Sequence, residues 1–147
     1  AVAAAYARYN YRGAVGRVCV VDFDAHFGDG TAACLLNLRP RSLTKPAGFG
    51  HSMTVPSYKP WLDHDDPDHV LFVSVHLHDA ERGFYPGTGA AGLVEGHPNI
   101  LSVPLSHGAG SAQFRLAVSD TLLPRVRAFE PQLILISAGF DGHADDV

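Results

Sequence analysis

The sequence predicts an α/β fold in which an open parallel sheet is flanked by helices. Three apolar runs of strand length, Val18–Asp22, Val70–His76 and Gln132–Ser137, are separated by segments with helical spacing. Strands that alternate with helices in this way are typical of parallel sheets with right-handed crossovers. Two of the runs end in acidic turns, and ligands of such sheets gather at the carboxyl ends of strands. A functional site is therefore expected at that edge.

The composition fits one domain-sized chain with a single core. The chain has 147 residues, of which 46% are hydrophobic, and its 11 basic and 15 acidic residues give a net charge of -4. No long basic run, membrane-spanning run or secretory signal is visible, so we expect no direct nucleic-acid or membrane binding. The only cysteines, Cys19 and Cys34, are interpreted as free thiols. We expect an intracellular protein of the nucleus or cytoplasm.

The first half of the chain contains a helix, a strand, a short helix and a long irregular segment. Residues 1–13 have high helix propensity, and residues 31–38 follow a glycine turn and resemble a short helix. Residues 37–69 contain five prolines and no sustained period, which predicts an insertion or an excursion over the surface. The end of this segment, DHDDPDH, is interpreted as a solvated charge run.

The second half repeats the alternation of strands and helices. After the strand at residues 70–76 and a glycine-rich turn, residues 99–103 form a third short strand. Ser111 is a sensible N-cap for the next helix, and Pro124 should kink that helix or restart it at a first-turn position. The run QLILIS from residue 132 is the most apolar of the predicted strands.

The stretch Arg17–Thr31, RVCVVDFDAHFGDGT, changes from apolar to polar within one strand. Asp22, Asp24 and His26 recur at every second position, so an extended backbone projects them to one side. Two carboxylates and an imidazole at the end of a buried strand would be costly to desolvate without a cation. The stretch therefore predicts a cation site.

The distant GFD sequence that ends the last strand supplies a third candidate ligand, Asp141. With Asp24 and His26 it offers two carboxylate oxygens and one imidazole nitrogen, and it leaves a coordination position open for water or substrate, as in catalytic zinc sites. The alternative is that Asp24 and Asp141 only cap the helices that follow their strands. Asp22 lies deeper in the strand and is assigned to orienting a histidine or to a separate cation site; alternatively, it bonds only to nearby backbone amides.

Three other motifs are less well matched. His76 and His78 are not followed by an aspartate at the spacing of HxHxDH hydrolases, because Asp79 comes immediately after His78. A two-metal site of the arginase type needs an aspartate two residues beyond His26, whereas Asp29 lies three beyond it. The glycines of HFGDGT match neither GxxxxGK nor GxGxxG.

Taken together, these motifs resemble the zinc-dependent histone deacetylases and the related acetylpolyamine amidohydrolases. VVDFDAHFGDGT resembles the family's metal-binding strand and turn, VSVHLHDAERGFYPGTG its next strand and glycine loop, and LILISAGFDGHADD the strand with its third ligand. The segment from Asn99 to Gln132 also reads like the family's connection. The resemblance implies the arginase-deacetylase fold and hydrolysis of acyl groups from lysine side chains of histones or other proteins, or from polyamines.

By position, the resemblance implies roles for individual residues. Asp24, His26 and Asp141 match the zinc ligands, and Asp22 matches the aspartate that orients a catalytic histidine. Phe84 and Tyr85 fall in the loop whose aromatic residue walls the acyl channel, with Tyr85 as the better candidate. A site for a structural monovalent cation such as K⁺ is matched by Asp22, Asp24, His26, Ser74 and Val75.

The sequence also departs from the family pattern. The paired catalytic histidines and the oxyanion tyrosine of a Gly-Gly-Tyr turn have no counterpart in residues 1–147, Phe27 replaces a usual histidine, and residues 37–69 replace a short connection. We therefore expect a partial deacetylase domain that holds the metal-binding half and is not a competent enzyme alone. The alternatives are an inactive metal- or partner-binding module and a plain nucleotide-binding α/β domain without metal. The expected partners are the acetylated substrates, while corepressor-type partners remain unknown.

Overall fold

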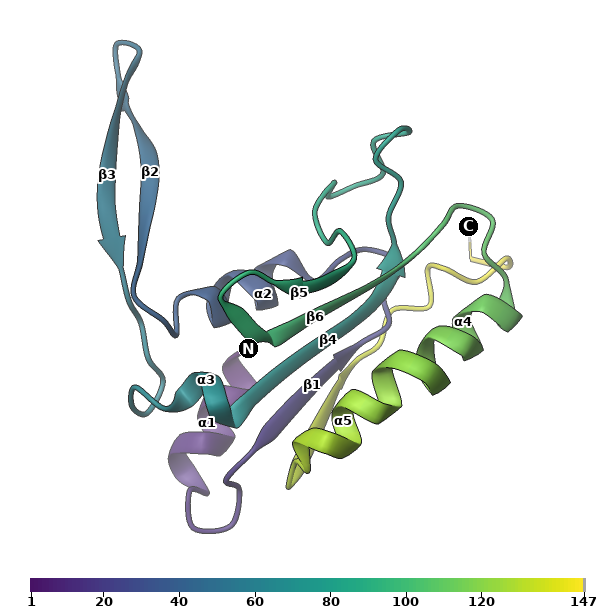
Figure 1. The fold of residues 1–147 in the computed structure, drawn as a ribbon, viewed down its shortest axis with the longest axis horizontal. Helices are drawn as coiled ribbons and strands as arrows, with labels where there is room; N and C mark the ends of the chain where they lie inside the picture. Colours follow the sequence, from purple (N-terminus) through teal and green to yellow (C-terminus); the bar gives the residue numbers. More distant parts are fainter. Residues whose placement is uncertain (147) are drawn as a thin grey trace.

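Four parallel strands and one antiparallel edge strand form the central sheet of the computed structural model, which describes residues 1–146 (Figure 1). Their order is β5-β6-β4-β1-β7, and a separate two-stranded sheet joins β2 and β3. The strands are β1 (Val18–Asp22), β2 (Arg41–Gly48), β3 (His51–Ser57), β4 (Val70–Leu77), β5 (Gly92–Val94), β6 (His97–Leu105) and β7 (Leu133–Ser137). The helices are α1 (Val2–Asn10), α2 (Asp29–Leu36), α3 (Asp66–His69), α4 (Ser111–Ala117), a π-helical turn (Val118–Leu122) and α5 (Leu123–Phe129). The predicted parallel α/β fold is confirmed.

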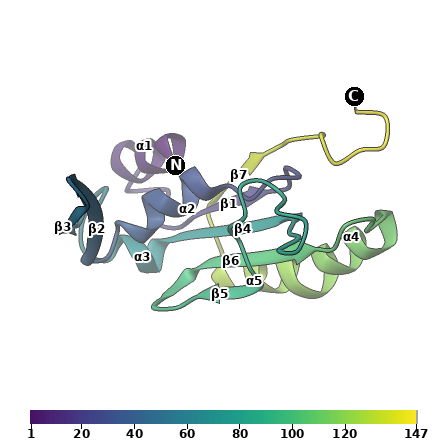
Figure 2. The same ribbon diagram turned by 90° about the horizontal axis from the view of Figure 1, so that it is seen from above.

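Helices cover both faces of the sheet, as Figure 2 shows, with α1 and α2 on one side and α4 and α5 on the other. Because side chains alternate along a strand, successive residues of β1 enter different cores: Val20 packs with α1 and α2, and Cys19 packs with the α5 side. Burying a side chain such as Leu35 or Leu71, neither of which is exposed, contributes about 1.5–3 kcal/mol. The two cores therefore hold the central strands rigidly.

The edges of the sheet are formed by β5 and β7. The short strand β5 was not predicted and pairs antiparallel with β6, so the sheet is not purely parallel. The apolar strand β7 lies at the other edge, where Ile134 and Ile136 are 48% and 64% exposed. Apolar composition alone does not show whether a strand is central or lies at an edge.

Residues 37–69, predicted as an insertion or an excursion over the surface, contain more regular structure than their prolines indicate. Most of them build the β2–β3 hairpin, which projects from the body of the molecule (Figure 1). Pro46 and Pro56 lie within its strands, which a ribbon exposed on both edges tolerates because edge positions need no ladder N–H. Gly48, Phe49 and Gly50 turn the chain with φ of 86°, 50° and 77°. The prolines are therefore compatible with strands in an exposed two-stranded ribbon.

The acidic run DHDDPDH is not wholly solvated, which corrects the second expectation for this segment. Asp66 begins α3 and is fully buried. One carboxylate oxygen pairs with the Arg8 guanidinium at 2.9 Å, and the other accepts the backbone N–H groups of Trp61, Leu62 and Asp63. A carboxylate satisfied in this way is stable without water, and it ties the hairpin's return to α1.

The long helical segment after β6 is confirmed with two changes. Ser111 is the first residue of α4, and Gly110 is the N-cap, whose N–H donates to the side-chain oxygen of Gln113 at 3.1 Å. Pro124 stands in the first turn of α5, as predicted, and the π-helical turn precedes it. Over residues 1–146, no helix combines the length and apolar character needed to cross a lipid bilayer.

Removing the buried carboxylate should destabilise the fold. Asp66→Ala leaves the Arg8 guanidinium buried without its partner and three N–H groups without an acceptor, so we expect a loss of about 3–5 kcal/mol in the free energy of unfolding. Urea titration of the wild type and the variant measures this difference. Asp65→Ala removes an exposed neighbouring carboxylate and should change stability by less than about 0.5 kcal/mol. Equal effects of the two substitutions would show that the Asp66 network is not a structural anchor.

Candidate metal centre

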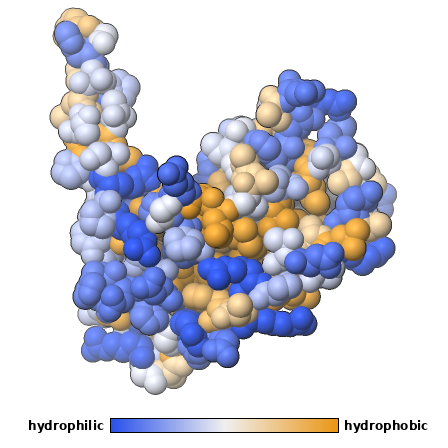
Figure 3. All heavy atoms as spheres, viewed as in Figure 1, coloured by the Kyte–Doolittle hydropathy of each residue, from blue (hydrophilic) through white to orange (hydrophobic). Residues whose placement is uncertain are grey.

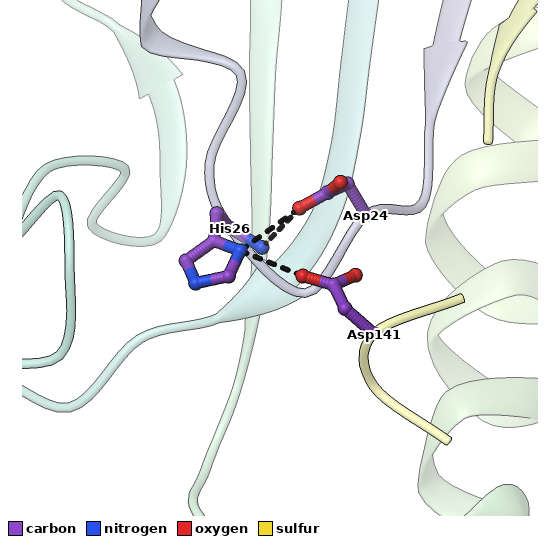
Figure 4. A group of neighbouring side chains, drawn as sticks. All are labelled: Asp24, His26 and Asp141. Atoms are coloured by element: carbon purple, nitrogen blue, oxygen red, sulfur yellow. Dashed lines mark hydrogen bonds and ion pairs between the residues drawn. The ribbon is translucent and has the colours of Figure 1, made fainter. Parts of the chain in front are cut away.

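The three predicted ligands meet at the carboxyl edge of the sheet. Asp24 and His26 lie in the turn after β1, and Asp141 lies in the turn after β7 (Figure 4). The two strands are parallel neighbours in which Asp22 pairs with Ser137. This register brings the two turns side by side although more than a hundred residues separate them in sequence.

The cluster is compact enough to share one ion. The His26 Nδ1 atom lies 2.8 Å from Asp141 Oδ2 and 3.1 Å from Asp24 Oδ1, and one ligand atom of each residue lies within 4.8 Å of the others. Figure 4 shows both carboxylates directed toward the same ring nitrogen of His26. The three groups therefore converge on one point.

Backbone hydrogen bonds hold both carboxylates in place. Asp24 Oδ1 accepts the His26 N–H at 2.7 Å, and Asp141 Oδ1 accepts the Ala25 N–H at 3.0 Å. The Ala25 bond, followed by the charge of the neighbouring His26 ring, lowers the pKa of Asp141 below its usual value. Asp141 is therefore kept as a carboxylate, which is the form that binds a metal.

A glycine makes room for this arrangement. A Cβ atom at Gly139 would lie 2.1 Å from Asp24 Oδ2 and 2.9 Å from Asp141 Oδ1, so any side chain there would displace both ligands. We did not single out Gly139 from the sequence. The sequence does indicate this glycine indirectly, because it lies between the end of an apolar strand and the candidate ligand Asp141.

The donor set fits a divalent cation with a preference for mixed nitrogen and oxygen ligands. Two carboxylates and one imidazole satisfy three positions of a tetrahedral zinc site, and their charges balance a divalent ion. The alternative that both aspartates cap helices does not hold, because α2 starts at Asp29 with Gly28 as its N-cap, and Asp141 bonds to Ala25 across the sheet. The residues present fit a bound metal.

Asp22 lies beneath the cluster and is 3% exposed. Its Oδ1 atom accepts the Asp24 N–H at 3.1 Å, which is the backbone bonding that the alternative interpretation anticipated. Burial raises the pKa of this carboxyl above its usual value. A Cβ atom at Gly28 would lie 2.4 Å from Asp22 Oδ2, so this glycine allows the turn to pack closely over the carboxyl group.

Ser74 and Val75, assigned to a monovalent-cation site, have different surroundings. Ser74 stands opposite Asp22 in the β1–β4 register, on the same side of the sheet. Its hydroxyl lies 2.9 Å from the Nδ1 atom of His76. Val75 is buried in the opposite core and can offer only its backbone carbonyl. The cation site therefore stays a prediction.

His76 is a buried residue whose role the sequence did not reveal. Its Nε2 atom lies 2.8 Å from the Gly89 carbonyl, which can only accept, so Nε2 carries the proton and Nδ1 accepts the Ser74 hydroxyl. Its ring packs 4.8 Å from the ring of Phe27. A Cβ atom at Gly89, where φ is 89°, would lie 2.5 Å from His76 Nε2. His76 thus tethers the glycine-rich loop to β4 and is not a ligand.

The two loop aromatics lie beside the cluster. Phe84 stacks on the His26 ring with centroids 5.1 Å apart and planes at 12°, and Tyr85 meets the same ring edge-on at 6.0 Å. Phe84 is half-buried, and Tyr85 is 73% exposed. The structure therefore brings both predicted aromatic residues to the site, with Phe84 in closer contact with the candidate ligand.

Comparisons with known proteins identify relatives of this chain in sequence and in structure. The family model described as "Histone deacetylase domain" matches residues 1–147. "Type-2 histone deacetylase 2" of Dictyostelium discoideum is 36% identical over 88% of this chain and 6% of its own length. The solved structure of the histone deacetylase Clr3 is similar with a TM-score of 0.68 and 28% identity, over 95% of this chain and 20% of that chain. The crystal structure of an acetylpolyamine aminohydrolase from Burkholderia pseudomallei is similar with a TM-score of 0.64 and 29% identity, over 97% of this chain and 34% of that chain. The chain spans about a third or less of these three relatives.

Protonation of His76 should lower the free energy of unfolding as the pH decreases. Burial lowers the pKa of this imidazole below the unfolded value of about 6.5, so the unfolded chain takes up a proton that the folded chain does not. The contribution of the neutral ring is complete above the unfolded pKa and is lost as the pH falls below it. Urea titrations between about pH 5 and pH 8 should show a larger decline for the wild type than for His76→Gln, whose amide can still donate to Gly89. Identical declines would contradict the assignment.

Proposed function

Because this chain belongs to the histone deacetylase family, we propose that it forms the metal-binding part of a zinc-dependent deacetylase. The reaction is hydrolysis of acetyl or other acyl groups from lysine side chains of histones or other proteins, or from polyamines. The observation that supports this proposal best is the convergence of Asp24, His26 and Asp141 on one point. The names of the relatives, which include histone deacetylases and an acetylpolyamine aminohydrolase, indicate these two classes of substrate.

Asp24, His26 and Asp141 would hold the zinc ion, and Asp22, Ser74 and the backbone near them would hold a structural K⁺. Bound zinc supplies a Lewis acid that polarises an amide carbonyl and lowers the pKa of water. The N–H groups of Ala25 and His26 keep the two carboxylates pointed at the site, so little reorganisation is needed when the ion binds.

The other residues would position and enclose the substrate. Asp22 accepts the Asp24 N–H and so supports the ligand turn from below; we assign it a positioning role toward a catalytic histidine outside residues 1–147. Phe84 and Tyr85 stand beside the His26 ring and offer apolar surface to an acyl-lysine stem. The stem of an acetylated lysine is uncharged and flexible, so aromatic walls would orient it at the metal.

The inactive-module alternative is favoured by one observation. In the part of the chain that the structure describes, the cluster contains a single histidine, His26, and this residue is itself a ligand. No second imidazole is therefore available there to move a proton. The residues present can bind a metal and an acylated partner without turnover.

The state of the cysteines supports an intracellular location, in the nucleus or cytoplasm. Cys19 and Cys34 are both free in the structure. Burial raises the pKa of the Cys19 thiol to about 12, which leaves it unreactive. Free thiols without a disulfide framework are typical of reducing compartments.

Metal analysis tests the site directly. Purified wild type should bind one zinc ion, and Asp141→Asn should bind zinc at least about tenfold more weakly, because only two charged or imidazole ligands remain. Asp145→Asn, which changes an exposed carboxylate on the same segment, should bind as the wild type does. Equal, negligible zinc in the wild type and Asp141→Asn would contradict the metal assignment and favour the nucleotide-binding alternative.

Peptide binding and turnover test the deacetylase assignment. The zinc-loaded chain should bind an acetyl-lysine peptide more tightly than its unmodified form, and Phe84→Ala should reduce that affinity at least about threefold by removing an aromatic wall. Isothermal titration measures both affinities. Equal affinity for the two peptides would contradict the proposed substrate class. Robust hydrolysis by the isolated chain would instead contradict its assignment as a metal-binding part alone.

A further inference from the structure

The β2–β3 hairpin, residues 41–57, is called the arm here, and it stands clear of the molecule in Figure 3. Its strands contact each other along their length, and its tip residue Phe49 is fully exposed. A two-stranded ribbon with both faces in water buries little apolar surface of its own. Packing within the ribbon therefore does not explain why it projects from the body, and an anchor at its base or a binding role for its surface would explain it.

The base of the arm is anchored on the body. The Asn37 carbonyl accepts the Lys59 N–H at 2.7 Å, and the Ser57 hydroxyl donates to the Asn37 side chain at 2.7 Å. Just beyond, the buried Asp66 binds the returning chain to Arg8. The arm is thus fixed at its base rather than being a loose excursion, and its orientation is part of the fold.

Charge separates the arm from the rest of the chain. The arm contains two of the 11 basic residues, Arg41 and Lys45, and no acidic residue occurs between positions 30 and 62. The remainder therefore carries nine basic against 15 acidic residues. A cationic arm on a strongly acidic body is drawn toward negative surfaces and repelled by the cationic peptides or amines that the proposed active site would take.

The two faces of the arm differ in chemistry. Side chains that stand opposite each other in an antiparallel pair share a face. The register pairs Leu43 with Val55 and Lys45 with Met53, and Arg41 lies on the same side, so this cationic face combines two positive charges with apolar groups: Arg41, Leu43, Lys45, Met53 and Val55. The opposite face carries only small hydroxyl residues and prolines: Ser42, Thr44, Pro46, Ser52, Thr54 and Pro56.

The cationic face has no partner within the described molecule. Among residues 1–146, neither Arg41 nor Lys45 takes part in an ion pair, whereas the nearby Arg39 pairs with Asp68 at 3.3 Å. Met53 is 51% exposed. Two unpaired cations beside an exposed methionine and the half-buried Leu43 and Val55 form a surface that matches acidic and apolar side chains on one face of an extended chain.

The arm also lies away from the candidate metal centre. It returns to the body at α3, immediately before β4 begins, whereas the metal cluster follows the carboxyl end of β1, the parallel neighbour of β4 (Figure 1). The eight residues of β4 span about 26 Å at about 3.3 Å per residue. A partner on the arm would therefore leave the metal centre open.

We propose that the cationic face of the arm binds an acidic, partly apolar segment of a partner protein. Nucleic acid fits less well, because two cations on this face, on a body of opposite charge, neutralise few phosphates, and the apolar groups between them contact no backbone charge. An extended peptide whose every second residue is alternately acidic and apolar, as in Glu-Ser-Val-Ser-Glu, places its carboxylates at Arg41 and Lys45 and its apolar groups over Leu43, Val55 and Met53.

Fluorescence anisotropy with the full chain and a labelled peptide of repeating Glu-Ser-Val-Ser, which presents Glu and Val on one face when extended, tests the proposal. Arg41→Glu/Lys45→Glu should weaken binding at least about tenfold, because two attractive contacts become repulsive. The matched control Arg12→Glu/Arg115→Glu makes the same net-charge change at exposed positions of the body and should stay within about twofold of the wild type. Circular dichroism checks that all variants are folded.

Three results would overturn the proposal. The first is equal peptide affinity of the arm variant and the wild type. The second is tighter binding of labelled duplex DNA than of the peptide, with the same sensitivity to Arg41→Glu/Lys45→Glu. The third is self-association in analytical ultracentrifugation that the arm substitutions abolish, which would assign the face to a second copy of this chain. Peptide binding that requires the arm, by a chain that remains monomeric, supports it.

Discussion

The candidate site depends on the parallel pairing of β1 with β7. This pairing sets Asp22 opposite Ser137 and therefore places the turn that carries Asp24 and His26 beside the turn that carries Asp141. The hydrogen bond from the Ala25 N–H to Asp141 then joins the turns directly. Leu133 and Leu135 of β7 pack against the core on the side of α1 and α2, so the packing of that core favours this register and with it the geometry of the polar cluster.

Three carboxylates lie close together at the end of β1, and their mutual repulsion is only partly offset by hydrogen bonds within the fold. Backbone N–H groups satisfy one oxygen each of Asp22, Asp24 and Asp141. Of the remaining oxygens, Asp141 Oδ2 lies 2.8 Å from His26 Nδ1, and the glycines at positions 28 and 139 let the chain pack closely against the second oxygens of Asp22 and Asp24. A cation at this point would neutralise the remaining charge, which is the physical reason for assigning the cluster to a metal.

The molecule is divided into a body with the candidate site and an arm that points elsewhere. The buried pair of Arg8 and Asp66 connects them, because the same carboxylate that holds α1 also receives the chain as it returns from the arm. The segment between residues 30 and 62, which includes the arm, carries basic but no acidic residues, and all 15 acidic residues lie in the remainder. The proposed partner and the proposed substrate would therefore occupy separate surfaces.

The sequence by itself determined the parallel α/β class, the central strands β1 and β4 and the three candidate ligands, whose side chains converge in the structure. Those features depend on local patterns, namely apolar runs of strand length and polar residues at every second position, which the chain carries whatever surrounds it. The resemblance to the deacetylases added Phe84 and Tyr85 as candidate channel residues, and the structure places both beside His26.

Only the tertiary structure decided the rest. It showed that Asp66 is buried rather than solvated, that His76 tethers Gly89, and that residues 41–57 form a ribbon with one cationic face. Each of these depends on partners distant in sequence: Asp66 on Arg8, His76 on a loop thirteen residues away, and the face of Lys45 on its register with Met53. A local pattern cannot encode such pairings, because the same acidic run or proline-rich segment is equally compatible with solvent until the fold supplies a neighbour.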